Sequence, residues 1–156
     1  MELQDELAEV VSADLARLGF GRRSNSWYRA GKYVYAVVSL QRSSWDSSVY
    51  VNVGLSPVEQ ANRGWLPESK CQVRFRADAI RSVSPAGLAL LSEAGLSSAG
   101  HEDWQERVRR DLIDPLVQIL ERVVDLESLG QIVRSELSAK VMVHRDIRAA
   151  LHLEGD

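Results

Sequence analysis

The sequence predicts an α+β protein in which a four-stranded antiparallel meander sheet packs against an N-terminal helix and a C-terminal helical set. Three observations lead to this prediction. Apolar residues near the N-terminus recur every three or four positions, the period of a helix face. Between Ser26 and Arg76 the period becomes two, as in half-buried strands. After residue 77 the helical period returns, so strands and helices are segregated along the chain.

The first helix is expected over residues 2–18. Its apolar face consists of Leu3, Leu7, Val10, Val11, Leu15 and Leu18. Gly19 is the expected stop, because glycine readily adopts the left-handed conformation that often follows a helix. Arg17 lies in the last turn, where a cation interacts favourably with the helix dipole.

Four strands are expected next, over residues 26–29, 33–42, 48–55 and 70–76. The second and third are rich in β-branched and aromatic residues, and the third alternates strictly. Short connections favour antiparallel neighbours. A longer loop with Pro57, Gly64 and Pro67 precedes the fourth strand. Further helices are expected over residues 85–94, from about residue 101 with a kink before Pro115, and over residues 126–137 and 141–153.

Strand alternation divides the predicted sheet into two faces. The expected core face carries Val34, Ala36, Val38, Leu40, Val49, Val51, Val53, Leu55, Cys71, Val73 and Phe75. The opposite face carries Tyr33, Tyr35, Ser39, Gln41, Tyr50, Asn52, Gln72, Arg74 and Arg76. Tyrosine, arginine and amide side chains are typical of binding surfaces. This face is equally consistent with the solvated side of an antiparallel sheet, or with a face that helices cover.

The candidate binding residues are Arg29, Tyr35, Gln41, Trp45, Tyr50, Asn52, Arg74 and Arg76. Arg29 belongs to a segment between Leu15 and Trp45 that contains cations and no carboxylate. Trp45 lies in a predicted loop, where it either anchors a partner or folds back over the sheet edge. A structural explanation also stands, in which polar residues of the face form a hydrogen-bonded cluster and Gly54 permits a close approach. Gln41, Asn52 and Arg74 are the members expected of that cluster.

No catalytic residue, metal ligand or cofactor is predicted. His144 and His152 are eight positions apart, about 12 Å along a helix, which is too far for one metal ion. Cys71 lies on the expected core face, without a neighbouring base to activate it. Phosphate-loop, dinucleotide-binding and hydrolase motifs are absent from the sequence. The sequence therefore favours binding over catalysis.

Size and charge limit the remaining classes. The 156 residues suit a single domain over residues 1–156. The net charge of -3 counts against nucleic-acid binding. One cysteine, an acidic N-terminus and the lack of a long apolar run predict a cytoplasmic protein without a membrane segment. The sequence predicts no oligomeric state.

Several short elements resemble, in order, the bacterial family called domain of unknown function 4304. They are Leu18-Gly19-Phe20, Trp27-Tyr28-Arg29, Gln41-Arg42-Ser43, the strand from Tyr50 to Leu55, Cys71-Gln72-Val73-Arg74, and Trp104. The resemblance spans about residues 3–137. The family is uncharacterised, so the resemblance implies no activity. Small bacterial proteins of this general kind sometimes look like immunity proteins that neutralise toxins, which is an analogy of context.

Three functional hypotheses follow. The preferred one is a protein-binding module, such as an immunity-like or inhibitor protein, that uses the Tyr/Arg/Asn face of the sheet. The alternative is a small-molecule or phosphate-ester binding protein or enzyme, in which Arg29, Arg74 and Arg76 converge on one pocket and hold an anion. Nucleic-acid binding through Tyr33, Tyr35 and Trp45 is the least favoured, because the protein is acidic.

Overall fold

A computed structural model describes residues 2–153, apart from the side chains of Arg63 and His101. Helix α1 (Leu3–Arg17) buries its apolar face, including Leu7, Val11 and Leu15. The helix ends in a Schellman motif. The N–H of Gly19, which has a φ of 83°, donates to Ala16 O, and the N–H of Phe20 donates to Leu15 O. The predicted first helix and its glycine stop are confirmed.

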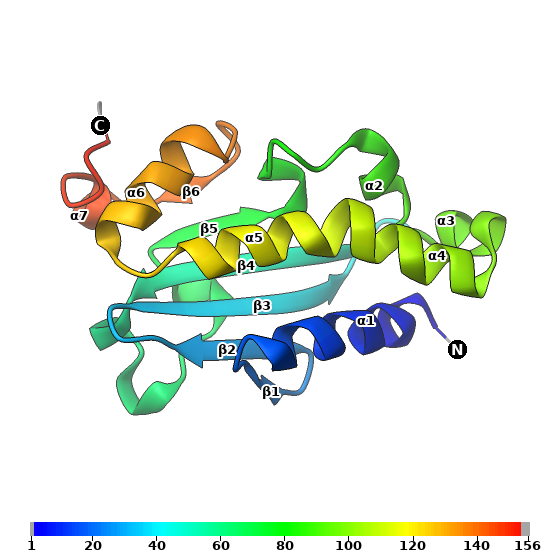
Figure 1. The fold of residues 1–156 in the computed structure, drawn as a ribbon, viewed down its shortest axis with the longest axis horizontal. Helices are drawn as coiled ribbons and strands as arrows, with labels where there is room; N and C mark the ends of the chain where they lie inside the picture. Colours follow the sequence, from blue (N-terminus) through cyan, green and yellow to red (C-terminus); the bar gives the residue numbers. More distant parts are fainter. Residues whose placement is uncertain (1, 154–156) are drawn as a thin grey trace.

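The sheet is an antiparallel meander, as predicted, but it has six strands instead of four. The strands are β1 (Gly21–Arg23), β2 (Ser26–Ala30), β3 (Val34–Arg42), β4 (Val49–Pro57), β5 (Val73–Arg76) and β6 (Met142–Val143). Their spatial order equals their order in the sequence (Figure 1). The two additional strands are the edge strands β1 and β6. Each has only two or three residues, which is too few for a periodic pattern in the sequence to reveal a strand.

Strand β6 corrects the helix expected over residues 141–153. Met142 pairs with Arg74 and Val143 pairs with Val73, and the N–H of His144 donates to Gln72 O. Free backbone groups at the edge of β5 therefore bind this segment as a strand. Only the short helix α7 (Arg145–Arg148) follows.

The remaining helices follow β5. The single helix expected over residues 85–94 is two helices, α2 (Pro85–Ala89) and α3 (Glu93–Ala99), because Ser92 caps the second by accepting from Gly95 N–H. Helices α4 (His101–Val108) and α5 (Asp114–Arg122) are joined by a π-helical turn, Arg109–Ile113. This irregularity lies directly before Pro115, where a kink was predicted. Helix α6 (Leu126–Ser135) begins with a capping box formed by Asp125 and Ser128.

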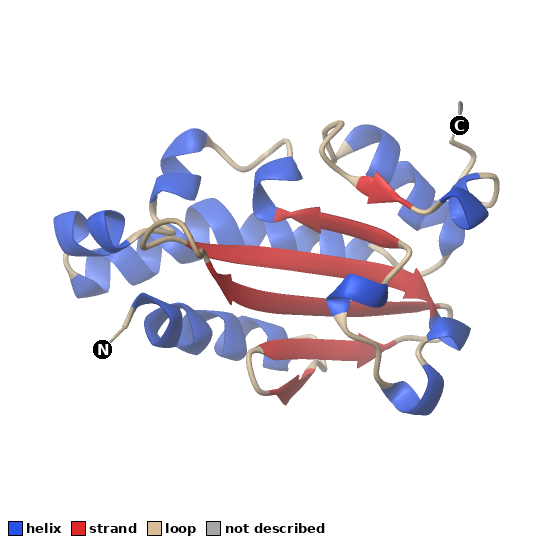
Figure 2. Ribbon diagram, turned by 180° about the vertical axis from the view of Figure 1, so that it is seen from behind, coloured by secondary structure: helices blue, strands red, loops and turns tan. Residues whose placement is uncertain are grey.

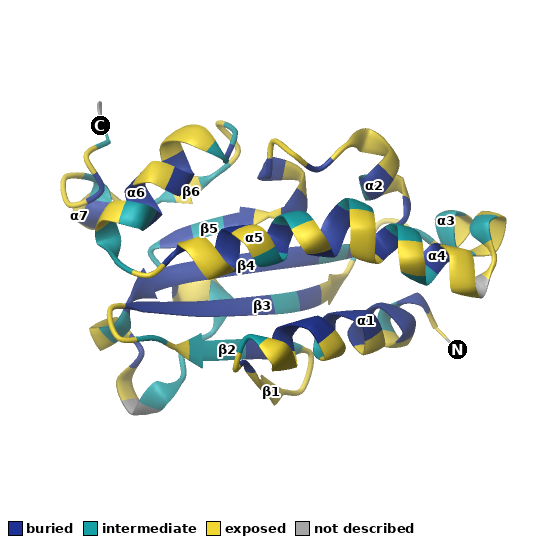
Figure 3. Ribbon diagram, in the orientation of Figure 1, coloured by how far each residue is buried: buried dark blue, intermediate teal, exposed yellow. Residues whose placement is uncertain are grey.

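The helices lie on one face of the sheet, and α1 and α5 run across it (Figure 1). The sides of these helices that face the sheet are buried, whereas the outer sides are exposed (Figure 3). The core between the two layers includes Val38, Val53, Phe75, Leu116 and Leu120. Seen from behind, the opposite face of the sheet is crossed only in part by the chain between β4 and β5 (Figure 2). No helix among the described residues has the length and apolar character needed to span a membrane.

Candidate functional site

The chain between β4 and β5 covers part of the sheet face that the helices leave open. This covering loop, residues 58–72, contains three short 3₁₀ turns, Val58–Gln60, Asn62–Gly64 and Glu68–Lys70. Its apolar residues form a second cluster with the sheet, which consists of Tyr28, Tyr35, Val37, Ala61, Trp65, Leu66 and Cys71. The face is therefore divided into a covered half and an open half.

Cys71 belongs to this second cluster and not to the main core, which corrects the sequence prediction. Strand β5 begins only at Val73, so the alternation of the strand does not extend back to Cys71. The thiol lies against Gly54, where a Cβ atom would approach Cys71 Sγ to 2.6 Å. The close approach expected at Gly54 is thus present. Burial raises the pKa of the Cys71 thiol to about 12, so the nucleophilic thiolate is strongly disfavoured.

Tyr35 was predicted to be a binding residue, but it is fully buried beneath the covering loop. Its hydroxyl donates to Leu66 O over 2.7 Å and accepts from Leu66 N–H over 3.1 Å. Burial raises the pKa of Tyr35 to about 12. Tyr35 therefore holds the loop on the sheet, and it offers no surface to a ligand.

Arg29 was also predicted to be a binding residue, and it lies on the other face of the sheet. Its Nη1 donates to Leu18 O over 3.1 Å and its Nη2 donates to Leu120 O over 3.0 Å. The guanidinium also stacks on the ring of Phe20 at 4.8 Å. Burial lowers the pKa of Arg29 from its usual value, against an opposing contribution from Glu121. Arg29 joins the ends of α1 and α5 and has no place in the open half of the opposite face.

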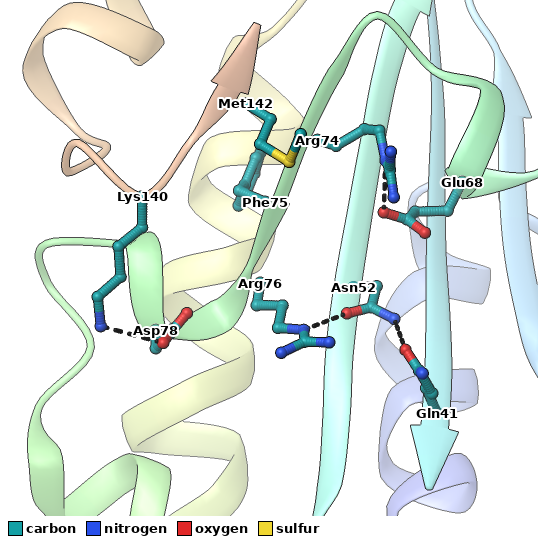
Figure 4. Close-up of a pocket in the computed structure, with 9 residues that line it drawn as sticks. All are labelled: Gln41, Asn52, Glu68, Arg74, Phe75, Arg76, Asp78, Lys140 and Met142. Carbon is teal, nitrogen blue, oxygen red and sulfur yellow. Dashed lines mark hydrogen bonds and ion pairs between the residues drawn. The ribbon is translucent and has the colours of Figure 1, made fainter. Parts of the chain in front are cut away.

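The open half contains Gln41, Tyr50, Asn52, Arg74 and Arg76, all of them predicted. Most of these side chains line a polar cleft of about 340 Å³ (Figure 4). The residues that line the polar cleft are Gln41, Asn52, Glu68, Arg74, Phe75, Arg76, Asp78, Lys140 and Met142. They come from β3, β4 and β5, from the 3₁₀ turn after β5, from the covering loop, and from β6 and the residues that lead into it.

A row of hydrogen bonds crosses three strands at this cleft. Asn52 Nδ2 donates to Gln41 Oε1 over 2.8 Å, and Arg76 Nε donates to Asn52 Oδ1 over 3.3 Å (Figure 4). The expected cluster of Gln41, Asn52 and Arg74 therefore contains Arg76 instead of Arg74. The strand register explains the exchange, because Asn52 is paired with Arg76 whereas Arg74 is opposite Gly54.

The charges of the cleft are unequally paired. Arg74 Nε lies 3.2 Å from Glu68 Oε1, and Lys140 Nζ lies 3.1 Å from Asp78 Oδ2. Arg76 instead stacks on the ring of Tyr50, with its Cζ atom 4.0 Å from the ring centroid. Among the described residues, no carboxylate lies within 4 Å of the Arg76 guanidinium. Arg76 is therefore the cation of the cleft that its surroundings leave uncompensated.

Trp45 lies at the tip of the β3–β4 hairpin and is 92% exposed. The tip is ordered by local hydrogen bonds, since Ser43 Oγ accepts from Trp45 N–H and Asp46 Oδ1 accepts from Ser48 N–H. Hydrogen bonds from Ser48 hold the pKa of Asp46 below its usual value. The indole does not fold back over the sheet edge, which was one of the two expectations for this residue.

Sequence reasoning missed Glu68, Asp78, Lys140 and Met142 at the cleft. Lys140 and Met142 reach it only because the segment before α7 returns to pair with β5, and a helix was expected there. Arg74 and Glu68 are six positions apart across an irregular loop, so no periodic pattern indicates their ion pair. Among the described residues, no three His, Cys, Asp or Glu side chains gather in a way that would hold a metal ion.

The structure defines an α+β protein with helices on one face of a six-stranded meander and an arginine-bearing polar cleft on the other. The family model "Domain of unknown function (DUF4304)" matches residues 11–120, which is most of the chain. The chain belongs to this family. No curated protein matches the chain, and no solved structure does. The matched region runs from α1 into α5, so α6, β6 and the cleft residues Lys140 and Met142 lie beyond it.

Proposed function

We propose that the protein is a protein-binding module that recognises its partner through the open half of the sheet face. The observation that carries this proposal is the position of the polar cleft between two exposed apolar side chains. Trp45 is 92% exposed at the hairpin next to Tyr50, and Met142 is 62% exposed on β6. Tryptophan, tyrosine and arginine contribute most often to the binding energy of protein interfaces, and methionine is enriched there.

The arginine pocket of the alternative hypothesis has less support. That hypothesis requires Arg29, Arg74 and Arg76 to converge, but Arg29 lies on the helix-covered face and bonds to backbone carbonyls. Arg74 is already paired with Glu68. The cleft volume is at the lower end of the about 300–1,000 Å³ typical of small-molecule pockets. These features suit contact with a few side chains of a partner better than enclosure of a cofactor.

Nucleic-acid binding through stacked aromatic residues has the least support. Tyr35 is buried, and Tyr33 and Trp45 lie at opposite ends of β3. A nine-residue strand is about 30 Å long, so the two exposed rings do not share one platform.

We retain an immunity-like or inhibitor role as the proposed kind of partner recognition. The cytoplasm remains the proposed compartment, because a single buried free thiol is natural in a reducing environment.

The test is affinity capture from a lysate of the source organism, followed by reconstitution with the purified partner. The wild type is compared with a Trp45→Ala/Arg76→Ala variant, which removes one exposed aromatic and one cation from the proposed surface. The matched control is Lys32→Ala/Tyr33→Ala, which removes an exposed cation and the aromatic ring that it stacks on at 5.3 Å, at the far end of β3.

The proposal expects one defined protein that binds the wild type and the control with equal affinity. The Trp45→Ala/Arg76→Ala variant should bind that protein at least about thirtyfold more weakly, because loss of two central contacts of this kind costs about 2–4 kcal/mol. A partner that binds this variant normally but is lost with the Lys32→Ala/Tyr33→Ala control would place the interface elsewhere and refute the proposal.

A further inference from the structure

The guanidinium of Arg76 is held in place, and its outer edge is free. Its Nε atom is occupied by Asn52 Oδ1, and Asn52 is fixed in turn by Gln41. The plane of the group rests on the ring of Tyr50. Among the described residues, neither Nη1 nor Nη2 of Arg76 has a hydrogen-bond partner. Two parallel donors are thus presented at the open face of the sheet.

We infer that Arg76 is a receptor for a carboxylate, namely the side chain of an Asp or Glu in an extended segment of the partner protein. This inference rests on the proposed function and specifies the chemistry of its central contact. Two adjacent N–H donors of one guanidinium match the two oxygens of a carboxylate, which gives a bidentate pair. Because Asn52 and Tyr50 already restrict the side chain, less conformational entropy is lost when the carboxylate binds.

The charge of the cleft favours a carboxylate over a phosphate group. Glu68 compensates Arg74 and Asp78 compensates Lys140, so a single positive charge is left for a ligand. That charge matches one carboxylate. A phosphate monoester carries a charge of about −1.5 to −2 and three acceptor oxygens, and it would also meet the two carboxylates that line the cleft.

The surroundings of Arg76 indicate that the acidic residue has an apolar neighbour. Met142 lines the cleft beside the cations, and it is largely exposed. Trp45 lies beyond Tyr50 at the hairpin tip. An extended segment alternates its side chains, so one that places a carboxylate on Arg76 also passes apolar groups over these surfaces. The segment expected to bind therefore combines Asp or Glu with apolar residues close in sequence.

The test is selection from a displayed library of random peptides on immobilised wild-type protein. Three variants are selected in parallel, namely Arg76→Lys, Arg76→Glu and the control Lys32→Glu, and thermal melting checks that each is folded. The expected result is enrichment of peptides with Asp or Glu at one fixed position beside apolar residues. The Arg76→Lys variant keeps the charge but loses the paired donors, so it should bind these peptides about tenfold or more weakly. The Arg76→Glu variant should lose them, whereas Lys32→Glu should keep them.

Enriched peptides without a fixed acidic position would overturn the inference, and so would equal affinity for the wild type and Arg76→Lys. Failure to enrich any peptide also counts against it, because an extended segment is then not the ligand. If free phosphate displaces the enriched peptides more effectively than acetate does, the group that Arg76 recognises is a phosphate and the inference of a carboxylate is wrong. If these results are negative while the captured partner still requires Trp45 and Arg76, the proposed function stands and only the carboxylate chemistry fails.

Discussion

At the scale of single residues, the three sheet arginines Arg29, Arg74 and Arg76 have three different environments. Arg29 bonds to two backbone carbonyls beneath the helices, Arg74 pairs with Glu68 of the covering loop, and Arg76 stacks on Tyr50 with its outer edge free. Strand register and chain direction set these differences, although the residue type is the same. Replacement of each arginine should therefore have a different consequence.

Arg29→Ala should destabilise the protein by about 1–3 kcal/mol, because Leu18 O and Leu120 O lose their charged donor. Arg76→Ala should destabilise the protein by about 1 kcal/mol or less, because the side chain is exposed and only Asn52 Oδ1 loses its donor. Urea denaturation of the two variants beside the wild type measures both values. Equal destabilisation by the two replacements would contradict the assignment of Arg29 to structure and Arg76 to recognition.

Gly54→Ala should destabilise the protein by about 1–3 kcal/mol, because the new methyl group would lie within 3 Å of Cys71 Sγ and Cβ. The double variant Gly54→Ala/Cys71→Ala removes the sulfur and should recover part of this loss. The two effects should therefore be non-additive in a double-mutant cycle measured by urea denaturation. Simple additivity would show that the covering loop does not press on Gly54.

At the scale of elements, the covering loop decides which part of the polar face is surface. Alternation in the sequence correctly indicated that Tyr35, Tyr50, Asn52 and Arg74 share a face. It contained no information on where the loop would lie, because loop packing depends on the meeting of distant side chains such as Tyr35 and Leu66. The long, strongly patterned strands were predictable for the same reason that the loop was not, namely that their signal is local and periodic.

The covering loop should make stability sensitive to alkaline pH. The pKa values of Cys71 and Tyr35 are raised from 9.0 and 10.0 to about 12, so the folded protein binds these protons more tightly than the unfolded chain. The contribution of these two protonated groups to the free energy of unfolding is complete below pH 9, and it is lost as the pH rises from about 9 to about 12. Urea midpoints measured across this range should fall, and they should fall less steeply in Cys71→Ala and Tyr35→Phe variants.

The reactivity of the Cys71 thiol is a second measure of how well the covering loop shields the residues beneath it. At neutral pH a thiol reagent should modify Cys71 slowly in the native protein and rapidly in urea, because the thiol is buried and protonated. Trp65→Ala removes a ring that packs against Tyr28 and should accelerate the native reaction. A native rate equal to the rate in urea would show that the loop does not shield the thiol.

At the scale of the whole molecule, the C-terminal segment completes both the sheet and the core. Ile147 and Leu151 are buried in the main core, and Arg134 Nη1 donates to Leu151 O over 2.6 Å. This region lies beyond the part matched by the family model, but it supplies β6 and two residues of the cleft. It was the least predictable part of the fold, because β6 has only two residues and forms only against the edge of β5.

Leu151→Ala should lower the free energy of unfolding by about 2–5 kcal/mol, as expected for a large buried side chain. Arg145→Ala is the matched control on the same segment, because its side chain is largely exposed, and it should be nearly neutral. Thermal and urea denaturation measure both. A neutral Leu151→Ala would show that the C-terminal segment is dispensable for the core.

The order of the elements has a consequence for synthesis on the ribosome. Strands β1 to β5 are complete once Arg76 has been made. Each of them pairs with its neighbour in sequence, so these five strands can pair before the later helices are synthesised. Helices α4 and α5, which cover much of its apolar face, end at Arg122. At a synthesis rate of about 5–20 residues per second, the apolar face of the sheet stays uncovered for roughly 2–9 s, until α4 and α5 have been made. During this interval the nascent chain presents a bare hydrophobic sheet with only α1 upon it, which is the kind of surface that chaperones bind.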